Sequence, residues 1–396
     1  MSTLLIKNAS VVLQDRLLLK HWVLCENNVI ALIGNEADFD GITADEEVDA
    51  GENYIAPGFI DMHIHGTCNY LVDKGKSQVE ELSGILPRFG VTGFLPTVCP
   101  LNSDDEDVGF ISSLSKAKSI GAAILGIFFE GHFLSLTGAI PVIPKGGDRV
   151  RRVKGLVEAA KPYKAIFSIS PELEGMEELV PYMAMDNTPV FITHTAASAM
   201  QTEKAIGLGA CHATHFYDVF PYQGEKEPGV RGCGAVEAVM AHPHVSVDFI
   251  LDGEHVDPIA VKMALACKGS DKVCLITDAN MSAGLPPGIY EGALGLEVEM
   301  LYEGGPARCT DKCKYPGSLA CSGLTMNLAV KNAVRLLGAS IPLAVKMASY
   351  NPARVLGIHN RKGAVAEGYD ADLVMLDKEL NVVKCWVGGQ CRYTVS

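Results

Sequence analysis

The sequence predicts an α/β fold: a (β/α)8 TIM barrel with a small β-sandwich domain formed from both chain termini. Three observations lead to this prediction. Eight short apolar runs are spread along the 396 residues, helical patterns lie between them, and ionisable residues follow many of the runs. A chain of this length can bury the core of one barrel and still add a small domain.

The eight apolar runs are rich in β-branched residues, which is typical of strands buried on both faces of a parallel sheet. In chain order, the predicted strands cover residues 55–61, 91–97, 123–129, 165–169, 189–193, 211–214, 245–250 and 273–277.

Helical patterns separate these strands. Ser103, with Glu106 three residues later, forms a capping box that opens one helix. Residues 198–208 and 324–337 carry apolar residues at helical spacing, and Gly338 ends the second of these segments. Eight alternations of strand and helix indicate a closed barrel, whose catalytic residues belong on the loops after the strands.

The two ends of the chain carry short alternating runs that are typical of strands. We therefore expect residues 1–54 and 351–396 to form the β-sandwich together. The remaining segment, residues 55–350, is then the barrel, which would carry the catalytic residues.

Composition excludes several classes of function. The formal net charge of −14 argues against a surface for nucleic acid or for anionic membranes. No apolar run reaches membrane-spanning length, and the first residues lack the layout of a signal peptide. The 12 cysteines are dispersed, which suits reduced thiols in a cytoplasm. We expect a cytoplasmic enzyme that acts on a small molecule, with neither nucleic acid nor membrane as a partner.

Three cysteines, Cys309, Cys313 and Cys321, lie in one predicted loop. They could bind zinc, but neither a fourth ligand nor a paired CxxC motif accompanies them, which favours ordinary loop thiols. Their role stays open.

Two histidines, His63 and His65, end the first predicted strand. Residues at positions i and i+2 of a strand point to the same side, so both imidazoles reach one point in space. Two neutral imidazoles at one point suit a transition metal. The same kind of residue follows the later strands, and a buried core would not select ionisable residues there. The residues concerned are Glu130, Glu172, His194, His215, His255 and Asp278.

The order HxH, Glu, His, His and Asp on successive strand ends resembles the amidohydrolase superfamily, as does the Gly-x4-Gly-x2-Ala-Asp-Leu-Val element of residues 363–374. Within that superfamily the whole chain resembles the N-acetylglucosamine-6-phosphate deacetylases. The motifs that carry this likeness are residues 129–133, 193–194, 213–215, 227–229, 252–257, 277–279 and 322–326.

The resemblance implies a ligand set. Glu130, His194 and His215 would hold one divalent ion, with Zn2+ the expected metal. His63 and His65 would hold a second ion, with Glu130 bridging the two, so we expect one or two ions per chain. The fourth strand ends at Glu172 rather than at a lysine, which argues against a hydantoinase-like or urease-like relative.

The resemblance also implies an activity: removal of an N-acetyl group from an amino sugar or amino-sugar phosphate. Asp278 would be the catalytic proton carrier, taking a proton from water and delivering it to the departing nitrogen. His255 resembles the histidine with which this family contacts its substrate. The family further implies a homodimer.

Four departures from the family lie around the substrate. His132 replaces a proline, and Lys226 replaces an arginine that reaches the partner subunit's phosphate. Asp218 replaces an asparagine that holds the sugar phosphate together with the next backbone amide, here that of Val219. An ionised aspartate only accepts hydrogen bonds and repels phosphate, and lysine lacks the guanidinium fork. The family's Lys-Gly-(Ala/Thr)-His element is not recognisable in residues 139–147.

Two other functions remain open at this point. One is an amidohydrolase that acts on another N-acyl or cyclic amide. The other is a catalytically idle relative that binds a sugar, although the complete ligand set and Asp278 argue against it.

Overall fold

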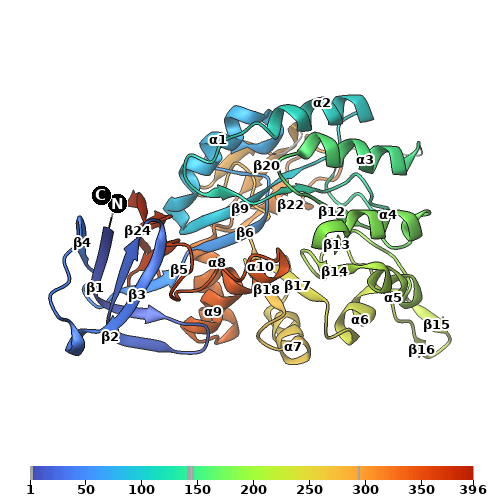
Figure 1. Ribbon diagram of the computed structural model, residues 1–396. Helices are drawn as coiled ribbons and strands as arrows, with labels where there is room; N and C mark the ends of the chain where they lie inside the picture. Colours follow the sequence, from blue (N-terminus) through green and yellow to red (C-terminus); the bar gives the residue numbers. More distant parts are fainter. Residues whose placement is uncertain (1–2, 141–143, 145–146, 293–294, 396) are drawn as a thin grey trace.

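The computed structural model describes residues 3–140, 144, 147–292 and 295–395, and it confirms the predicted (β/α)8 barrel (Figure 1). Within these residues, eight parallel strands surround the core, and the short β10 (Ala123–Ile124) precedes the third of them. The barrel strands are β6 (Phe59–Ile64), β9 (Val91–Val98), β11 (Ile127–Phe129), β12 (Ala165–Ile169), β13 (Val190–Ile192), β14 (Ala210–Ala213), β17 (Ser246–Ile250) and β18 (Val273–Ile276).

Each barrel strand leads into a helix on the outside of the barrel (Figure 1). These helices are α1 (Lys76–Ile85), α2 (Asp104–Leu114), α3 (Arg149–Ala160), α4 (Met176–Met183), α5 (Ala199–Leu208), α6 (Ala235–Ala241), α7 (Pro258–Lys268) and α8 (Met326–Asn332). Two more follow, α9 (Ile341–Ala348) and α10 (Tyr350–Val355). In the described part of the chain, we find no helix with the length and apolarity needed to span a bilayer.

The capping box predicted at Ser103 is formed only in part. The Ser103 hydroxyl accepts a hydrogen bond of 3.3 Å from the amide of Glu106 at the start of α2. The Glu106 carboxylate accepts from the amide of Asn102, one residue before the position that a capping box requires. At the start of α5, Ser198 and Gln201 form both halves of a capping box.

The first predicted strand is divided between two sheets. Its beginning, Tyr54–Pro57, forms β5 of the terminal sheet, and the barrel strand β6 starts at Phe59. Between them, the Gly58 amide donates to the Asp372 carbonyl at 2.9 Å. A Cβ atom at Gly58 would lie 2.2 Å from the Thr92 side chain, so only glycine fits there. The terminal sheet therefore runs directly into the strand that carries His63 and His65.

Both ends of the chain meet in one sheet, which confirms a small β domain built from the two termini. Its strands lie in the order β25-β24-β23-β5-β1-β2-β3, with β4 beside β1. Their bounds are β1 (Thr3–Val12), β2 (Leu17–Glu26), β3 (Val29–Asn35), β4 (Glu46–Asp49), β23 (Leu373–Leu376), β24 (Val382–Val387) and β25 (Gln390–Thr394). Side chains from both ends share one buried core, among them Ile6, Val23, Leu373 and Trp386.

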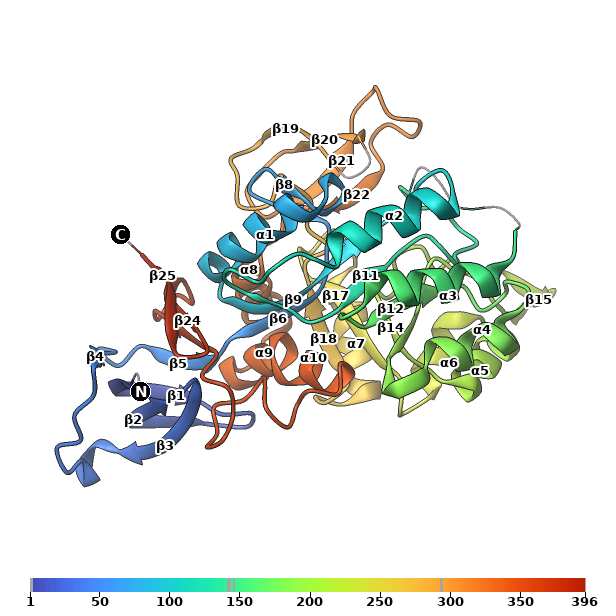
Figure 2. The same ribbon diagram turned by 45° about the horizontal axis from the view of Figure 1, so that its top comes forward.

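A four-stranded antiparallel sheet is inserted between β18 and α8, and it stands apart from the terminal sheet (Figure 2). Its strands are β19 (Gly288–Glu291), β20 (Glu297–Met300), β21 (Pro306–Cys309) and β22 (Leu319–Ser322). We call its described residues, 288–292 and 295–322, the insertion sheet. Two hairpins complete the described strands, β7 (Gly66–Thr67) with β8 (Tyr70–Leu71), and β15 (Glu225–Glu227) with β16 (Val230–Arg231).

The barrel closes between β6 and β18, a junction that we call the seam. Asp61 of β6 is fully buried, and the Thr277 hydroxyl after β18 donates to its carboxylate at 2.6 Å. Burial raises the pKa of Asp61 to about 7, against the effect of the hydrogen bonds from Thr277. Higher in the seam, the Asp278 amide donates to the His63 carbonyl at 2.8 Å. The seam thus holds Asp278 beside His63.

Replacing Thr277 with valine tests the seam. The Thr277→Val variant keeps the shape of the side chain but leaves a buried Asp61 oxygen without its donor. We expect the free energy of unfolding to fall by about 1–3 kcal/mol. Urea unfolding of chelator-treated protein measures it, with the exposed Thr394→Val as the control, for which we expect a change within about 0.5 kcal/mol. Equal stability of both variants would show that the seam does not depend on this bond.

Candidate active site

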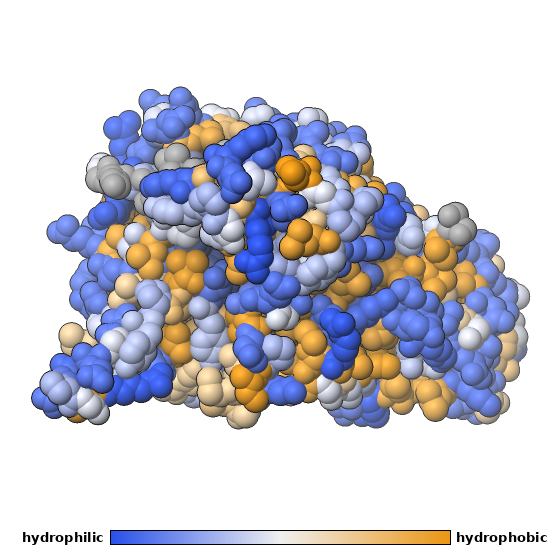
Figure 3. All heavy atoms as spheres, turned by 180° about the vertical axis from the view of Figure 1, so that it is seen from behind, coloured by the Kyte–Doolittle hydropathy of each residue, from blue (hydrophilic) through white to orange (hydrophobic). Residues whose placement is uncertain are grey.

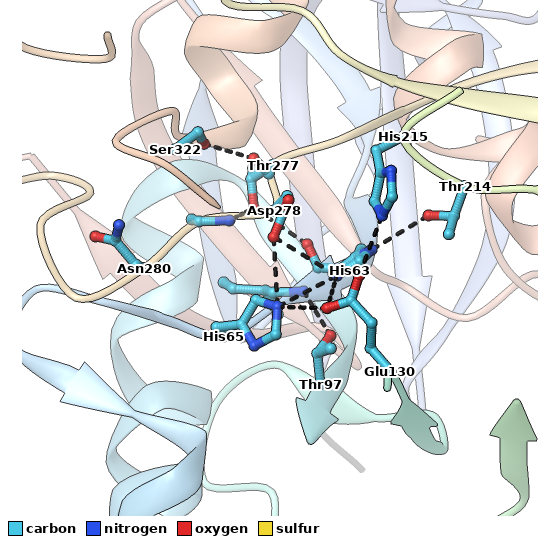
Figure 4. Close-up of polar contacts among 12 residues, drawn as sticks. His63, His65, Thr97, Glu130, Thr214, His215, Thr277, Asp278, Asn280 and Ser322 are labelled. Carbon is cyan, nitrogen blue, oxygen red and sulfur yellow. Dashed lines mark hydrogen bonds and ion pairs between the residues drawn. The ribbon is translucent and has the colours of Figure 1, made fainter. Parts of the chain in front are cut away.

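Six predicted site residues meet at the carboxyl ends of the barrel strands, and Figure 4 shows all of them except His194. All six are buried, with residue exposures of at most 8%. They come from the ends of five strands: His63 and His65 from β6, Glu130 after β11, His194 after β13, His215 after β14, and Asp278 after β18.

The Glu130 carboxylate lies between two pairs of histidines. Its Oε2 atom is 3.1 Å from Nε2 of His65 and 3.3 Å from Nε2 of His63. Its Oε1 atom is 3.1 Å from Nε2 of His215 and 3.3 Å from Nε2 of His194. One carboxylate oxygen therefore faces each histidine pair, which is the arrangement that a bridging ligand between two ions requires.

The donor atoms on the His63 side fit a divalent cation. The Nε2 atoms of His63 and His65 are 3.3 Å apart, and two nitrogen ligands of one tetrahedral zinc ion lie about 3.4 Å apart. Asp278 Oδ1 is buried without a hydrogen-bond partner and lies 3.4 Å from Nε2 of His65. A cation at this point would satisfy all three donors.

Contacts behind the imidazoles turn their Nε2 atoms toward Glu130. Nδ1 of His194 donates to the Leu136 carbonyl at 3.0 Å. The proton of that ring is therefore on Nδ1, and the Nε2 lone pair is available to a metal ion. Nδ1 of His63 lies 3.2 Å from the Thr214 hydroxyl. The backbone amide of His215 donates to Asp248 at 2.6 Å, and that carboxylate also bonds the ring of the buried His212.

Three of these residues have left-handed backbones, with φ values of 47° at His194, 33° at His215 and 45° at Asp278. Side chains other than glycine rarely adopt this conformation, and each instance costs about 1–3 kcal/mol. The sharp turn after each strand aims the side chain into the barrel mouth. Backbone strain of this kind is concentrated at functional sites.

A cavity of about 430 Å³ opens beside this cluster. Its lining includes Ile140, Asp218, Val219 and His255 from the barrel loops, and Leu296, Tyr315 and Leu319 from the insertion sheet. In the part of the chain that the structure describes, neither lysine nor arginine lines this cavity. The cationic groups that a phosphate prefers are therefore absent from its described walls.

Comparison with known proteins identifies the family. The sequence profile of the amidohydrolase family matches residues 54–392. The chain belongs to the amidohydrolase family. This confirms the resemblance inferred from the motifs, and because the family is metal-dependent, the six residues are a candidate metal centre.

Similar amidohydrolases act on amino-sugar phosphates. The N-acetylgalactosamine-6-phosphate deacetylase of Escherichia coli O157:H7 is 30% identical over 341 residues, which cover 85% of this chain and 87% of that protein. The N-acetylglucosamine-6-phosphate deacetylase of Lysinibacillus sphaericus is 31% identical over 382 residues, which cover 93% of this chain and 92% of that protein.

A solved structure of an N-acetyl-D-glucosamine-6-phosphate deacetylase variant from Mycobacterium smegmatis, in complex with N-acetyl-D-glucosamine-6-phosphate, superimposes with a TM-score of 0.87. It has 25% sequence identity and covers all of both chains.

The predicted substrate residues of this amidohydrolase fall into two groups. His255, Asp218 and Val219 line the cavity. His132 is buried away from its walls, with Nε2 3.6 Å from Asp107, and Lys226 lies on the exposed hairpin β15–β16. The roles of both residues in substrate binding stay predictions. Of residues 139–147, Ala139 and Ile140 line the cavity, whereas 141–143 and 145–146 lie outside the described residues.

Two cysteines in the cavity wall, Cys99 and Cys321, had not been assigned to the site from the sequence. Cys99 directly follows the barrel strand β9, just as the other site residues follow their strands. Its place after an apolar run could therefore have been noticed in the sequence. Cys321 belongs to β22 and precedes the Ser322-Gly323 motif. Cys309 and Cys313 are not among the described lining residues, and both belong to the core of the insertion sheet.

His255 gives a test of the cavity's electrostatics. Burial lowers the pKa of His255, but the hydrogen bond of 2.6 Å between its Nδ1 and Asp252, together with the charges of Asp252, Asp218 and Asp278, outweighs that effect and leaves the pKa raised. The Asp252→Asn variant removes the charge, so we expect a lower His255 pKa and loss of the imidazolium at lower pH. NMR titration of the imidazole measures this shift.

The matched control is Glu254→Gln, which removes a neighbouring carboxylate that bonds Tyr302 and Arg308 instead of His255. An unchanged pKa in Asp252→Asn, or an equal shift in the control, would contradict the assignment.

Proposed function

We propose that this amidohydrolase is a Zn2+-dependent deacetylase that removes the N-acetyl group of an amino sugar. The observation that carries the proposal is the Glu130 carboxylate between two histidine pairs, with Asp278 beside it at the wall of a sugar-sized cavity. The activities named for its relatives support the same reaction.

An amide resists hydrolysis because its carbonyl is a weak electrophile and its amine is a poor leaving group. Divalent ions held by His63, His65, Glu130, His194 and His215 would polarise the carbonyl and make water nucleophilic near pH 7. In this proposal, one or two ions serve this purpose, and zinc suits the imidazole-rich donor set.

Asp278 moves the proton in the proposed reaction. Its Oδ1 atom lies 3.4 Å from Nε2 of His65, it lacks a hydrogen-bond partner, and the residue lines the cavity. The carboxylate can therefore accept a proton from the attacking water and pass it to the amine nitrogen. His255 presents its other ring nitrogen, because Asp252 holds Nδ1, and it donates from there to the carbonyl oxygen or to a sugar hydroxyl.

We further propose that the preferred substrate lacks a 6-phosphate or carries its phosphate elsewhere. Asp218 lines the cavity, and an aspartate accepts hydrogen bonds from a hydroxyl or ammonium group but repels a phosphate. Two arginines that could offset it have other partners: Arg231 pairs with Glu237 at 2.7 Å, and Arg149 donates to the Glu174 carbonyl at 3.0 Å.

The proposed assembly is a homodimer joined through the hairpin of residues 225–231. All of these residues are exposed, and from behind the hairpin forms a mostly hydrophilic tip at the lower left (Figure 3). Tyr222 and Val230, 60% and 41% exposed, would become buried against a second copy. Sedimentation equilibrium should give twice the chain mass, and a monomer at micromolar concentration would contradict this assembly.

The Asp278→Asn variant tests the proton carrier. We expect metal content close to that of the wild type and a fall in kcat of about 10²–10⁴-fold, because general acid–base transfer is typically worth that much. Elemental analysis and steady-state kinetics measure the two quantities. The exposed Asp311→Asn is the control and should keep full activity. Retained turnover in Asp278→Asn would mean that another group moves the proton.

The substrate preference is tested by restoring the family's residues. The double variant Asp218→Asn, Lys226→Arg should raise kcat/KM for N-acetylglucosamine-6-phosphate relative to N-acetylglucosamine. The asparagine amide donates a hydrogen bond to phosphate where the aspartate carboxylate repels it, and arginine can bind phosphate through two N–H groups where lysine cannot. The panel should include N-acetylgalactosamine and its 6-phosphate. A wild-type enzyme that hydrolyses a 6-phosphate as efficiently as every other substrate would contradict the role of Asp218.

A further inference from the structure

One thiol lies inside the candidate metal centre. Cys99 follows the last residue of β9 and is only 9% exposed. Its Sγ atom, a ring nitrogen of His65 and a carboxylate oxygen of Glu130 all lie within 4.8 Å of one another. These three donors come from three neighbouring strands of the barrel, β6, β9 and β11.

We propose that Cys99 is a ligand of the ion held by His63 and His65, so that this half of the centre contains sulfur. The inference rests on the metal-dependent function proposed above. The same half contains Oε2 of Glu130, at 3.1 Å from His65, and the unpartnered Oδ1 of Asp278, at 3.4 Å. Cys99 adds a soft donor beside this set of nitrogen and oxygen atoms.

A second thiol in the same cavity makes the choice of Cys99 specific. Cys321 also lines the cavity, but it belongs to none of the sets of three donors found in the described part of the chain. Cys99 belongs to one such set, together with two residues already assigned to the centre. Cys321 is therefore a matched control for a cysteine that is near the centre without binding it.

The proposal distinguishes the two halves of the centre. Thiolate ligands favour zinc over harder ions such as manganese or magnesium. In the described residues, the half formed by His194 and His215 brings imidazoles and a carboxylate oxygen but no thiol to its ion. We infer that the two positions differ in metal preference. Binding at the Cys99 position breaks the S–H bond, forms a sulfur–metal bond and releases the proton to solvent.

X-ray absorption of the zinc-loaded wild-type protein tests the proposal directly. We expect a sulfur shell at about 2.3 Å in addition to nitrogen and oxygen ligands at about 2.0–2.2 Å. Cobalt titration of the metal-free protein gives a second readout, because cobalt bound to thiolate has a sulfur-to-metal charge-transfer band in the near ultraviolet. The Cys99→Ser variant should lose the sulfur shell and the band, and Cys321→Ser should keep both.

The outcomes separate this inference from the proposed function. Bound zinc with only nitrogen and oxygen ligands, in a wild type that deacetylates amino sugars, would overturn the role of Cys99 alone. Loss of the band in Cys321→Ser but not in Cys99→Ser would also overturn it. A protein that binds no metal would instead overturn the function on which the inference rests. If Cys99→Ser fails to fold, the wild-type and Cys321→Ser spectra still decide, because a sulfur shell that is lost in Cys321→Ser would overturn the assignment to Cys99.

Discussion

Glu130 is a carboxylate held almost out of water, and the barrel mouth is arranged to make that charge tolerable. Burial raises the pKa of Glu130, but the hydrogen bonds and charges of His63, His194 and His215 hold that pKa well below its usual range. An isolated buried carboxylate would be costly. The strand ends must therefore present several imidazoles at one point, and the left-handed turns at His194 and His215 are the local cost of doing so.

The sequence predicted the barrel because its strands are buried on both faces, so each one is a continuous apolar run that a single-sequence pattern can recognise. The site residues could be predicted as well, because ionisable side chains stand out directly after continuous apolar runs. The boundary at Gly58 between the terminal sheet and the barrel was not predicted. Both β5 and β6 are apolar, so the hydrophobic pattern does not show that they belong to different sheets. The insertion sheet was not predicted, because its strands are short and partly exposed and lack the continuous apolar runs of the barrel strands. Cys99 follows a barrel strand as the other site residues do, but its closeness to His65 and Glu130 is visible only once the strands are side by side.

The residues of the centre and those of the cavity are supported differently. His63 and Asp278 are held by the seam, where buried Asp61 and backbone hydrogen bonds fix the relative positions of β6 and β18. Asp218 and Val219 follow β14 on a loop that is half-buried. The centre therefore rests on the rigid core, whereas two of the departures from the family, Asp218 and Lys226, lie on more accessible segments. A third, His132, is buried.

The insertion sheet gives this division a consequence for evolution. One segment, with described residues 288–292 and 295–322, supplies Leu296, Tyr315 and Leu319 to a wall of the cavity, and it has a small apolar core of its own around Val298 and Ala307. At its end, the Ser322 amide donates to the Asp278 carbonyl at 2.8 Å, so this residue is tied to the centre. The rest of its sequence can drift without disturbing the strand ends that carry Glu130 and the histidines. A lineage could acquire new substrates by exchanging this one wall, while inheriting an unaltered hydrolytic centre from its ancestor.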